Sequence, residues 1–107
     1  MSADALRNVR VRIASGWSQE ADARDALGQE VPLAGEQAVE WTLSSAVALA
    51  GKDGIPMNHL PAALRALRAV TGMSSLDGWN DEAGRTKQEI LDALDAAIEC
   101  VEAGDDR

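Results

Sequence analysis

The sequence predicts a mainly all-α fold: a compact bundle of about four helices, with an irregular segment between the first two in which a short β-hairpin is one option. Two observations favour this class. Apolar residues recur with helical spacing in four stretches, which Gly and Pro residues separate. The hydrophobic fraction of 46% is built from Ala, Leu and Val, without Phe or Tyr. At this length we expect a single helical domain over residues 1–107.

The first helix is expected over residues 2–15. Leu6, Val9 and Ile13 recur with the spacing of one helical face. An acid lies near the start of this stretch and arginines lie toward its end, an arrangement that the helix dipole favours. Gly16 then ends the helix.

The connection over residues 17–35 has no clear period, because glycines and a proline interrupt it. We expect a short turn or helix near residues 19–24, followed by irregular backbone. An extended pair around residues 26–31, with Gly28 at the turn, is also compatible with this composition.

Two further helices follow this connection. Residues 36–50 carry a wide face of small side chains, which invites close helix packing. Pro56 and Asn58 open the next helix, whose apolar stripe covers residues 60–70 and which Gly72 ends.

The last helix has the clearest local signal, because Thr86-Lys87-Gln88-Glu89 matches a capping box. The helix is therefore expected to begin near Thr86 and to end at Gly104, leaving residues 104–107 as a short acidic tail. Its apolar positions share one arc, and acids occupy the adjacent flank with no Lys or Arg between them. These acids are Glu89, Asp92, Asp95, Glu99 and Glu102.

Negative charge is concentrated toward the end of the chain. Residues 73–107 hold ten acids against three bases, a net of −7, and the first 72 residues hold eight acids against seven bases, a net of −1, which gives the overall −8. Acids three or four residues apart on a helix repel by about 0.2–0.5 kcal/mol, and acids near its C-terminus oppose the dipole. A helix that accepts both penalties indicates a binding face, whereas a solvated face is the ordinary alternative.

The remaining residues do not form a catalytic or metal-binding pattern. His59 is the only histidine, and Cys100, the only cysteine, lies on another predicted helix. The acidic stretch from Asp77 to Asp81 fails the spacing of a calcium-binding loop, and no glycine-rich phosphate loop is present. We therefore predict a protein that is not an enzyme and that uses no cofactor and no metal.

Composition also restricts compartment and partners. A single cysteine excludes an internal disulfide and favours a reducing compartment. No stretch approaches the roughly 18 apolar residues needed to span a bilayer, and the N-terminus lacks the pattern of a signal peptide. We therefore expect a cytoplasmic protein without membrane contact. A pI near 4.4 argues against direct binding to nucleic acid, so a charged partner would present a basic surface.

The connection over residues 73–85 is too apolar for a solvated linker. Its tripeptide Trp79-Asn80-Asp81 joins a large anchor to two short polar side chains, which most often cap or form Asx turns. The functional alternative is that this loop presents Trp79, Asn80 and Asp81 to a partner. These three residues join the five acids of the last helix as candidate protein-binding residues.

Four groups of residues, spread over nearly the whole chain, follow a Gly-Trp-Ser/Thr-Gln, Ala-x-x-Trp and Trp-Asn-Asp pattern. They are Gly16-Trp17-Ser18-Gln19; Ala23 with Asp25-Ala26 and Gly28; Ala38 with Trp41 and Ala46; and Trp79-Asn80-Asp81 with Arg85-Thr86 and Ile90. In these motifs the chain resembles an uncharacterised family of small helical proteins, found mainly in actinobacteria and their plasmids and phages. The resemblance implies a compact helical domain. Its mobile-element context implies a small antagonist of a defence system, of the anti-CRISPR type.

Three functions follow from these observations. The first is a non-enzymatic protein-binding module, an acidic inhibitor that docks its last helix on a basic protein surface and, where that surface holds nucleic acid, mimics phosphates. The second is a small-ligand or enzymatic domain with a pocket lined by the three tryptophans, with Asn80, Asp81 and His59 as its polar groups. The third is a homo-oligomer paired through the small-residue face of residues 36–50.

Overall fold

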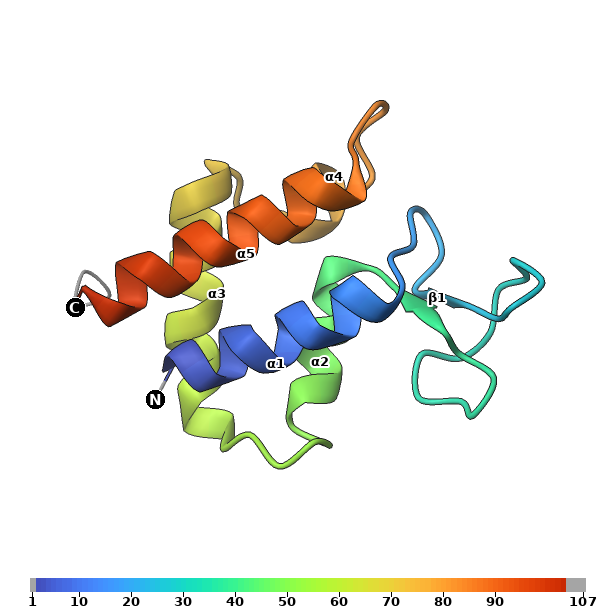
Figure 1. The fold of residues 1–107 in the computed structure, drawn as a ribbon, viewed down its shortest axis with the longest axis horizontal. Coiled ribbons are helices and arrows are strands. Elements are labelled where there is room, and N and C mark those ends of the chain that lie inside the picture. The colour runs from blue at the N-terminus through green and yellow to red at the C-terminus, as the bar shows by residue number, and fades with distance from the viewer. Residues whose placement is uncertain (1, 104–107) are drawn as a thin grey trace.

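The computed structural model describes residues 2–103, in which five α-helices surround one core. The elements, in order, are α1 (Ser2–Ser15), β1 (Ala23–Arg24), β2 (Glu40–Trp41), α2 (Leu43–Ala50), the 3-10 turn η1 (Met57–His59), α3 (Leu60–Thr71), α4 (Leu76–Asn80) and α5 (Lys87–Glu102). α1 and α5 lie side by side and antiparallel, α3 crosses both, and α2 packs against α1 (Figure 1). The predicted mainly all-α class is confirmed.

The core is formed by apolar residues of all five helices, to which α4 contributes Leu76. Its largest fully buried apolar side chains are Leu6, Val9, Ile13, Leu43, Leu67, Ile90 and Leu94. Burial of each such side chain contributes about 1.5–3 kcal/mol. Ala46 and Ala50 of α2 are fully buried in the same cluster, so the small-residue face of this helix packs within the chain.

Three helix predictions are confirmed by local contacts. α1 covers residues 2–15 as expected, and α3 ends at Gly72, which has a left-handed φ of 72°. α5 begins with the predicted capping box: Thr86 Oγ1 accepts from the Glu89 N–H at 3.2 Å, and Glu89 Oε1 accepts from the Thr86 N–H at 2.9 Å. The last residue of α5 is Glu102, and the predicted stop at Gly104 and the tail 104–107 lie outside the described residues.

The predicted start of the helix over residues 36–50 is wrong. α2 begins at Leu43, because Thr42 is its N-cap and accepts from the Ser45 N–H at 3.2 Å. The residues before Thr42 form a turn and β2. Backbone pairing with distant segments fixes this conformation, since the Trp41 N–H donates to the Gly16 carbonyl at 3.1 Å.

β2 is the middle of three extended segments between α1 and α2. It pairs antiparallel with β1, with Ala23 opposite Trp41, and on its other side Trp17 pairs with Trp41 in parallel. The turn at Gly28 that the extended-pair alternative placed there is present, with φ of 80°, and Arg24 and Glu30 pair across it. The short turn or helix expected near residues 19–24 is not a helix; residues 19–22 are bends and residues 23–24 form β1.

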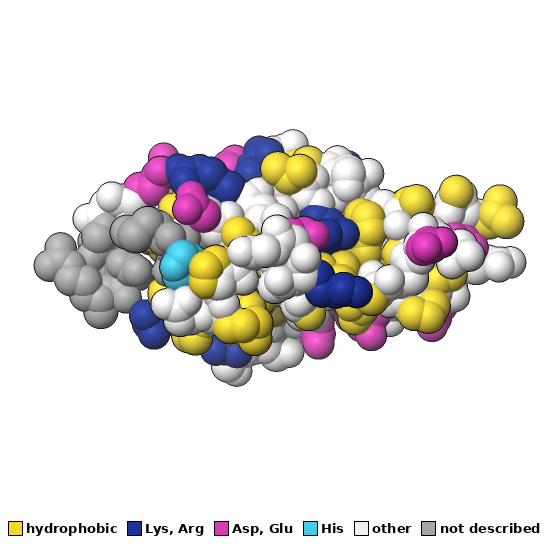
Figure 2. Space-filling view, turned by 90° about the horizontal axis from the view of Figure 1, so that it is seen from below, with side chains coloured by type: hydrophobic (Ala, Val, Ile, Leu, Met, Phe, Trp, Pro, Cys, Tyr) yellow, Lys and Arg dark blue, Asp and Glu magenta, His cyan; other side chains and the backbone are white. Residues whose placement is uncertain are grey.

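Two features of the connections were not predicted. α4 occupies part of the connection over residues 73–85, where Ser75 Oγ accepts from the Gly78 N–H at 3.1 Å. The segment of residues 25–38 projects from the helices at one end of the molecule (Figure 1). Leu27 on it is 83% exposed, and Figure 2 shows apolar and acidic side chains on this end.

Within residues 2–103, none of the helices has the length and apolar character required to cross a membrane.

Gly16 is required at the junction between α1 and the extended segment at Trp17. A Cβ added there would lie 1.9 Å from the Val39 carbonyl oxygen, a distance that forces the backbone to move. We predict that Gly16→Ala lowers the free energy of unfolding by about 1–3 kcal/mol, the usual cost of overpacking.

Urea denaturation measures this loss, with Gly78→Ala as the matched control. A Cβ on Gly78 of α4 meets Ser75 Oγ at 3.5 Å, an ordinary contact, so this change should stabilise the protein by about 0.5–1 kcal/mol. Equal stability of the two variants would contradict the close approach at Gly16.

Candidate functional site

The acids of α5 divide into two sets according to their partners. Asp95 accepts from Arg10 Nε at 2.6 Å, and Glu102 accepts from Arg7. Asp92 accepts only from Gln88 Nε2, at 2.8 Å, and neither Asp92 nor Glu99 forms a salt bridge within residues 2–103. The outer flank of α5 therefore has two ion-paired acids and two acids without a paired cation.

The expectation that this negative charge is uncompensated is corrected by α1. No Lys or Arg interrupts the acids along α5, but Arg7 and Arg10 reach across from the antiparallel helix. The hydrogen bond to Asp95 raises the pKa of Arg10, with a smaller contribution from the charge of Asp92. Both pairs are solvent-exposed, so each contributes only about 0–1 kcal/mol to stability.

Glu89 has its partners in the turn that precedes α5. Its carboxylate accepts from the Thr86 N–H and pairs with Arg85 at 3.4 Å. The hydrogen bond from the Thr86 N–H lowers the pKa of Glu89; desolvation, the next largest cause, opposes this shift, and the charge of Arg85 adds to it. Glu89 thus has a local role at the start of α5.

Asn80 is fully buried and makes four hydrogen bonds. Its Oδ1 accepts from Trp17 Nε1 at 2.8 Å and from the Leu43 N–H at 3.0 Å. Its Nδ2 donates to the Ser18 carbonyl at 3.0 Å and to Asp81 Oδ1 at 2.8 Å. These bonds use the full capacity of an Asn side chain, so Asn80 does not face a partner as a docking residue would.

The other members of the tripeptide flank this buried amide. Trp79 is half-buried, and Arg85 stacks over its ring with the guanidinium carbon 4.1 Å from the ring centre. Asp81 accepts from the Glu20 N–H at 2.9 Å. Gln19 Nε2 donates to the carbonyls of Asn80 and Glu82. The Gly-Trp-Ser-Gln and Trp-Asn-Asp motifs are therefore in direct contact, and their hydrogen bonds hold the two segments together.

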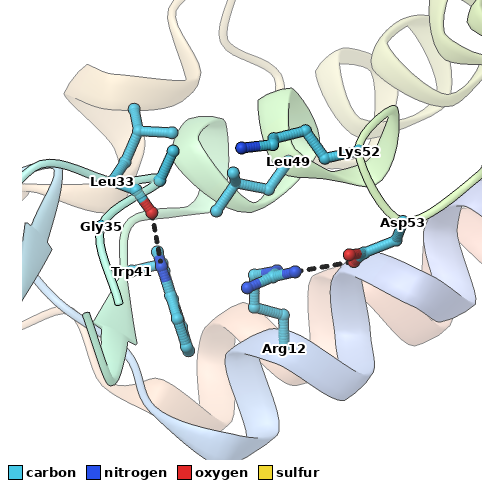
Figure 3. A pocket seen from close by; sticks show the side chains of 8 residues that line it. Arg12, Leu33, Gly35, Trp41, Leu49, Lys52 and Asp53 are labelled. Carbon is cyan, nitrogen blue, oxygen red and sulfur yellow. Dashed lines mark hydrogen bonds and ion pairs between the residues drawn. The ribbon is translucent and has the colours of Figure 1, made fainter. Parts of the chain in front are cut away.

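A second polar site, which sequence reasoning missed, lies between α1 and the turn after α2. The Arg12 guanidinium is 4.8 Å from the centre of the Trp41 ring, and its Nη2 donates to Asp53 Oδ2 at 2.7 Å. Trp41 Nε1 donates to the Leu33 carbonyl at 3.2 Å (Figure 3). Nothing in the spacing of these residues indicates that they meet.

Two hollows lie around this Arg12–Trp41 stack. One has a volume of about 260 Å³ and is lined by Arg12, Leu33, Ala34, Gly35, Trp41, Leu49, Lys52 and Asp53 (Figure 3). The other, of about 240 Å³, is lined by Asn8, Val11, Arg12, Ser15, Trp41 and Asp53.

The residues expected around a tryptophan pocket are dispersed. Of the three tryptophans and the polar group of Asn80, Asp81 and His59, only Trp41 lines these two hollows. His59 ends η1. Within residues 2–103 there is no cluster of three His, Cys, Asp or Glu side chains that could hold a metal ion.

The buried amide generates the first prediction for this region. Replacement Asn80→Ala leaves the Trp17 indole N–H, the Leu43 N–H and the Ser18 carbonyl without their partner in a buried place. Each such group costs about 1–3 kcal/mol, so we expect a loss of about 3–5 kcal/mol in the free energy of unfolding. Chemical denaturation measures it, and Asn58→Ala, at an exposed position of η1, should change stability little. A small effect at both positions would contradict the role of Asn80.

The Arg12–Asp53 pair should make the stability of the fold depend on pH. The hydrogen bond from Arg12, helped by one from Asn8 and opposed by partial burial, lowers the pKa of Asp53 from its ordinary value of 3.8. Because the pKa is lower in the folded than in the unfolded chain, the pair stabilises fully above about pH 4 and loses its contribution as pH falls through the lowered value.

Urea titrations of wild type and Asp53→Asn between about pH 6 and pH 2 test this dependence. The wild type should be the more stable at pH 6, and the gap should close at the acid end. Glu99→Gln, which removes an acid without a salt bridge among the described residues, controls for net charge. A gap that does not change with pH would show that the Asp53 carboxylate makes no such contribution.

Comparison with known proteins places the chain within a larger group. A family model described as a family of unknown function, DUF6197, matches residues 1–99. This match includes α1 to α4 and most of α5, and so both motifs that meet at Asn80. No curated protein and no solved structure matches the chain. The chain belongs to the DUF6197 family.

Proposed function

We propose that this chain is a non-enzymatic protein-binding domain that docks the outer flank of α5 on a basic surface of another protein. The observation that carries the proposal is the pair Asp92 and Glu99. Both side chains are exposed, they lie two turns apart on one flank, and neither has a salt-bridge partner within residues 2–103.

The surroundings of this pair are also negative. Around it lie Asp95, Glu102 and the nearby Asp4 on α1, so among residues 2–103 five acids face Arg7 and Arg10, a net of −3 for these side chains. A partner with clustered Lys or Arg side chains would complement this field, which speeds encounter and disfavours acidic competitors. Attraction of this kind weakens as salt screens it.

The charge of the flank favours a partner with a basic surface. We propose that the domain inhibits this partner by occlusion, as an antagonist of the anti-CRISPR or other anti-defence type acting in the cytoplasm, the class that the mobile-element context of the resemblance implies. Where the covered surface normally binds DNA or RNA, the carboxylates of α5 would take the place of phosphates. Trp79, Asp81 and Glu89, at the N-terminal end of α5, would border the contact.

The repulsion between neighbouring acids of α5 favours a binding role for the two that have no salt bridge within residues 2–103. Asp92, Asp95 and Glu99 are three and four residues apart in turn, so their mutual repulsion costs about 0.2–0.5 kcal/mol per neighbouring pair. Arg10 compensates Asp95 within the chain. Asp92 and Glu99 have no such intrachain compensation by a salt bridge among the described residues, which a cationic partner would provide.

Two double variants of equal charge test the proposal. Asp92→Asn with Glu99→Gln removes two acids without breaking a salt bridge, whereas Asp95→Asn with Glu102→Gln removes two acids and breaks the salt bridges that join Arg7 and Arg10 to α5, leaving Arg7 with Asp4. A partner is first captured from host lysate at low salt and released at high salt, and its Kd is then measured against each variant. Thermal unfolding reports the stability of both.

The D92N/E99Q variant should keep or slightly raise the melting temperature and should raise Kd about fivefold to thirtyfold, as expected for two exposed charge pairs. The D95N/E102Q variant should lose stability. If the partner binds nucleic acid, added DNA or RNA should displace the domain. An unchanged Kd for D92N/E99Q, or a Kd insensitive to salt, would refute docking through this flank.

A further inference from the structure

The two hollows beside Trp41 are lined by the two residues of the described chain that carry unsatisfied buried side-chain atoms. Within residues 2–103, the buried side-chain N and O atoms without a hydrogen-bond partner are Asn8 Oδ1 and Arg12 Nε. Both residues line the smaller hollow, and Arg12 also lines the larger one. Buried polar groups without partners are rare in folded proteins, and one common cause is a bound species that completes them.

The charge at the larger hollow favours an anion. Arg12 and Lys52 contribute two positive charges to its wall and Asp53 contributes one negative charge, a net of +1. Asp53 engages only Nη2 of Arg12, which leaves other donors of the guanidinium fork for a second carboxylate. The Lys52 side chain has no salt bridge within residues 2–103, and Figure 3 shows it on the same side of the hollow as Leu49.

The rest of the wall is apolar and planar. The Trp41 ring forms one side of the hollow, and the hydrogen bond from its Nε1 to the Leu33 carbonyl fixes its orientation. The side chains of Leu33 and Leu49 lie across from Arg12 (Figure 3). The volume of about 260 Å³ is just below the usual range of ligand pockets, which begins at about 300 Å³. The hollow therefore has room for a compact apolar group.

We propose that this hollow binds a small organic monoanion, a carboxylate attached to a compact planar or apolar body. The carboxylate lies between Arg12 and Lys52, where it brings the local net charge from +1 to zero. The body packs against Trp41, Leu33 and Leu49. A dianion would leave the site negative, and a neutral analogue would leave the positive charge uncompensated.

This site is separate from the docking flank. None of the residues lining either hollow belongs to α5, and the flank residues Asp92 and Glu99 contact neither Arg12 nor Lys52 through a salt bridge. The ligand site can therefore be tested independently of the proposed protein-binding function.

Sodium benzoate is the probe, and benzamide, which has the same shape without the charge, is its control. ¹H–¹⁵N spectra of the intact chain follow the three indole N–H signals, with that of Trp41 assigned from Trp41→Phe, and the Arg12 Nε–H signal. Benzoate should shift the Trp41 and Arg12 signals saturably and leave those of Trp17 and Trp79 in place. Benzamide should bind at least several-fold more weakly.

Lys52→Gln should weaken benzoate binding about two- to fivefold, the value of one exposed charge pair, with no change in melting temperature because Lys52 is exposed. Lys87→Gln removes the same charge from a residue that lines neither hollow and whose Nζ donates to the Ala14 carbonyl at 2.7 Å, and it should bind benzoate like wild type. D92N/E99Q should also bind like wild type.

Three results would overturn the assignment. Absence of a saturable shift at Trp41 would show that the hollow holds water only. Equal binding of benzoate and benzamide would show that the cations do not select an anion. Equal weakening by K52Q and K87Q would show that overall charge, and not the hollow, determines the interaction.

Discussion

The four hydrogen bonds of Asn80 are the constraint on which the arrangement of the other elements depends. They join the end of α4 to the Trp17–Ser18 segment and to the first N–H of α2. A helix start has backbone donors without partners inside the helix, and here one of them is satisfied by a side chain from a segment 37 residues away. Because a buried amide must have every bond made, the segments can meet in only one register. The position of β2, and through it of Trp41, follows from this register.

A second, weaker interaction aligns the two long helices. α1 and α5 are held by apolar packing, and Arg7 and Arg10 add exposed ion pairs along their shared edge. Such pairs contribute little to stability, but they give the negative flank a structured boundary. Asp95 and Glu102 pair with α1, whereas Asp92 and Glu99 are exposed and form no salt bridge within residues 2–103. Under the proposed function, the first two acids would serve the fold and the other two the partner, a division that composition alone does not show.

Local signals in the sequence predicted most of the helices, and long-range contacts explain the failures. The capping box at Thr86 and the left-handed stop at Gly72 depend only on neighbouring residues, so α5 and α3 were predictable. The start of α2 was not, because the backbone partners of Trp41 come from Gly16 and Ser18. The same limit applies to function. The acids of α5 were found from their spacing, whereas their arginine partners and the Arg12–Trp41–Asp53 site depend on contacts between distant segments.

The projecting segment of residues 25–38 contributes little to the core, unlike the helices. Apart from Ala38 its side chains are partly or fully exposed, and yet Leu33, Ala34 and Gly35 form one wall of the larger hollow. A change of sequence or length in such a surface loop costs the core little. Members of this family could therefore diversify what the hollow accepts by altering one wall, while the scaffold around Asn80 stays the same. The segment would give the domain a place to evolve new specificity without refolding.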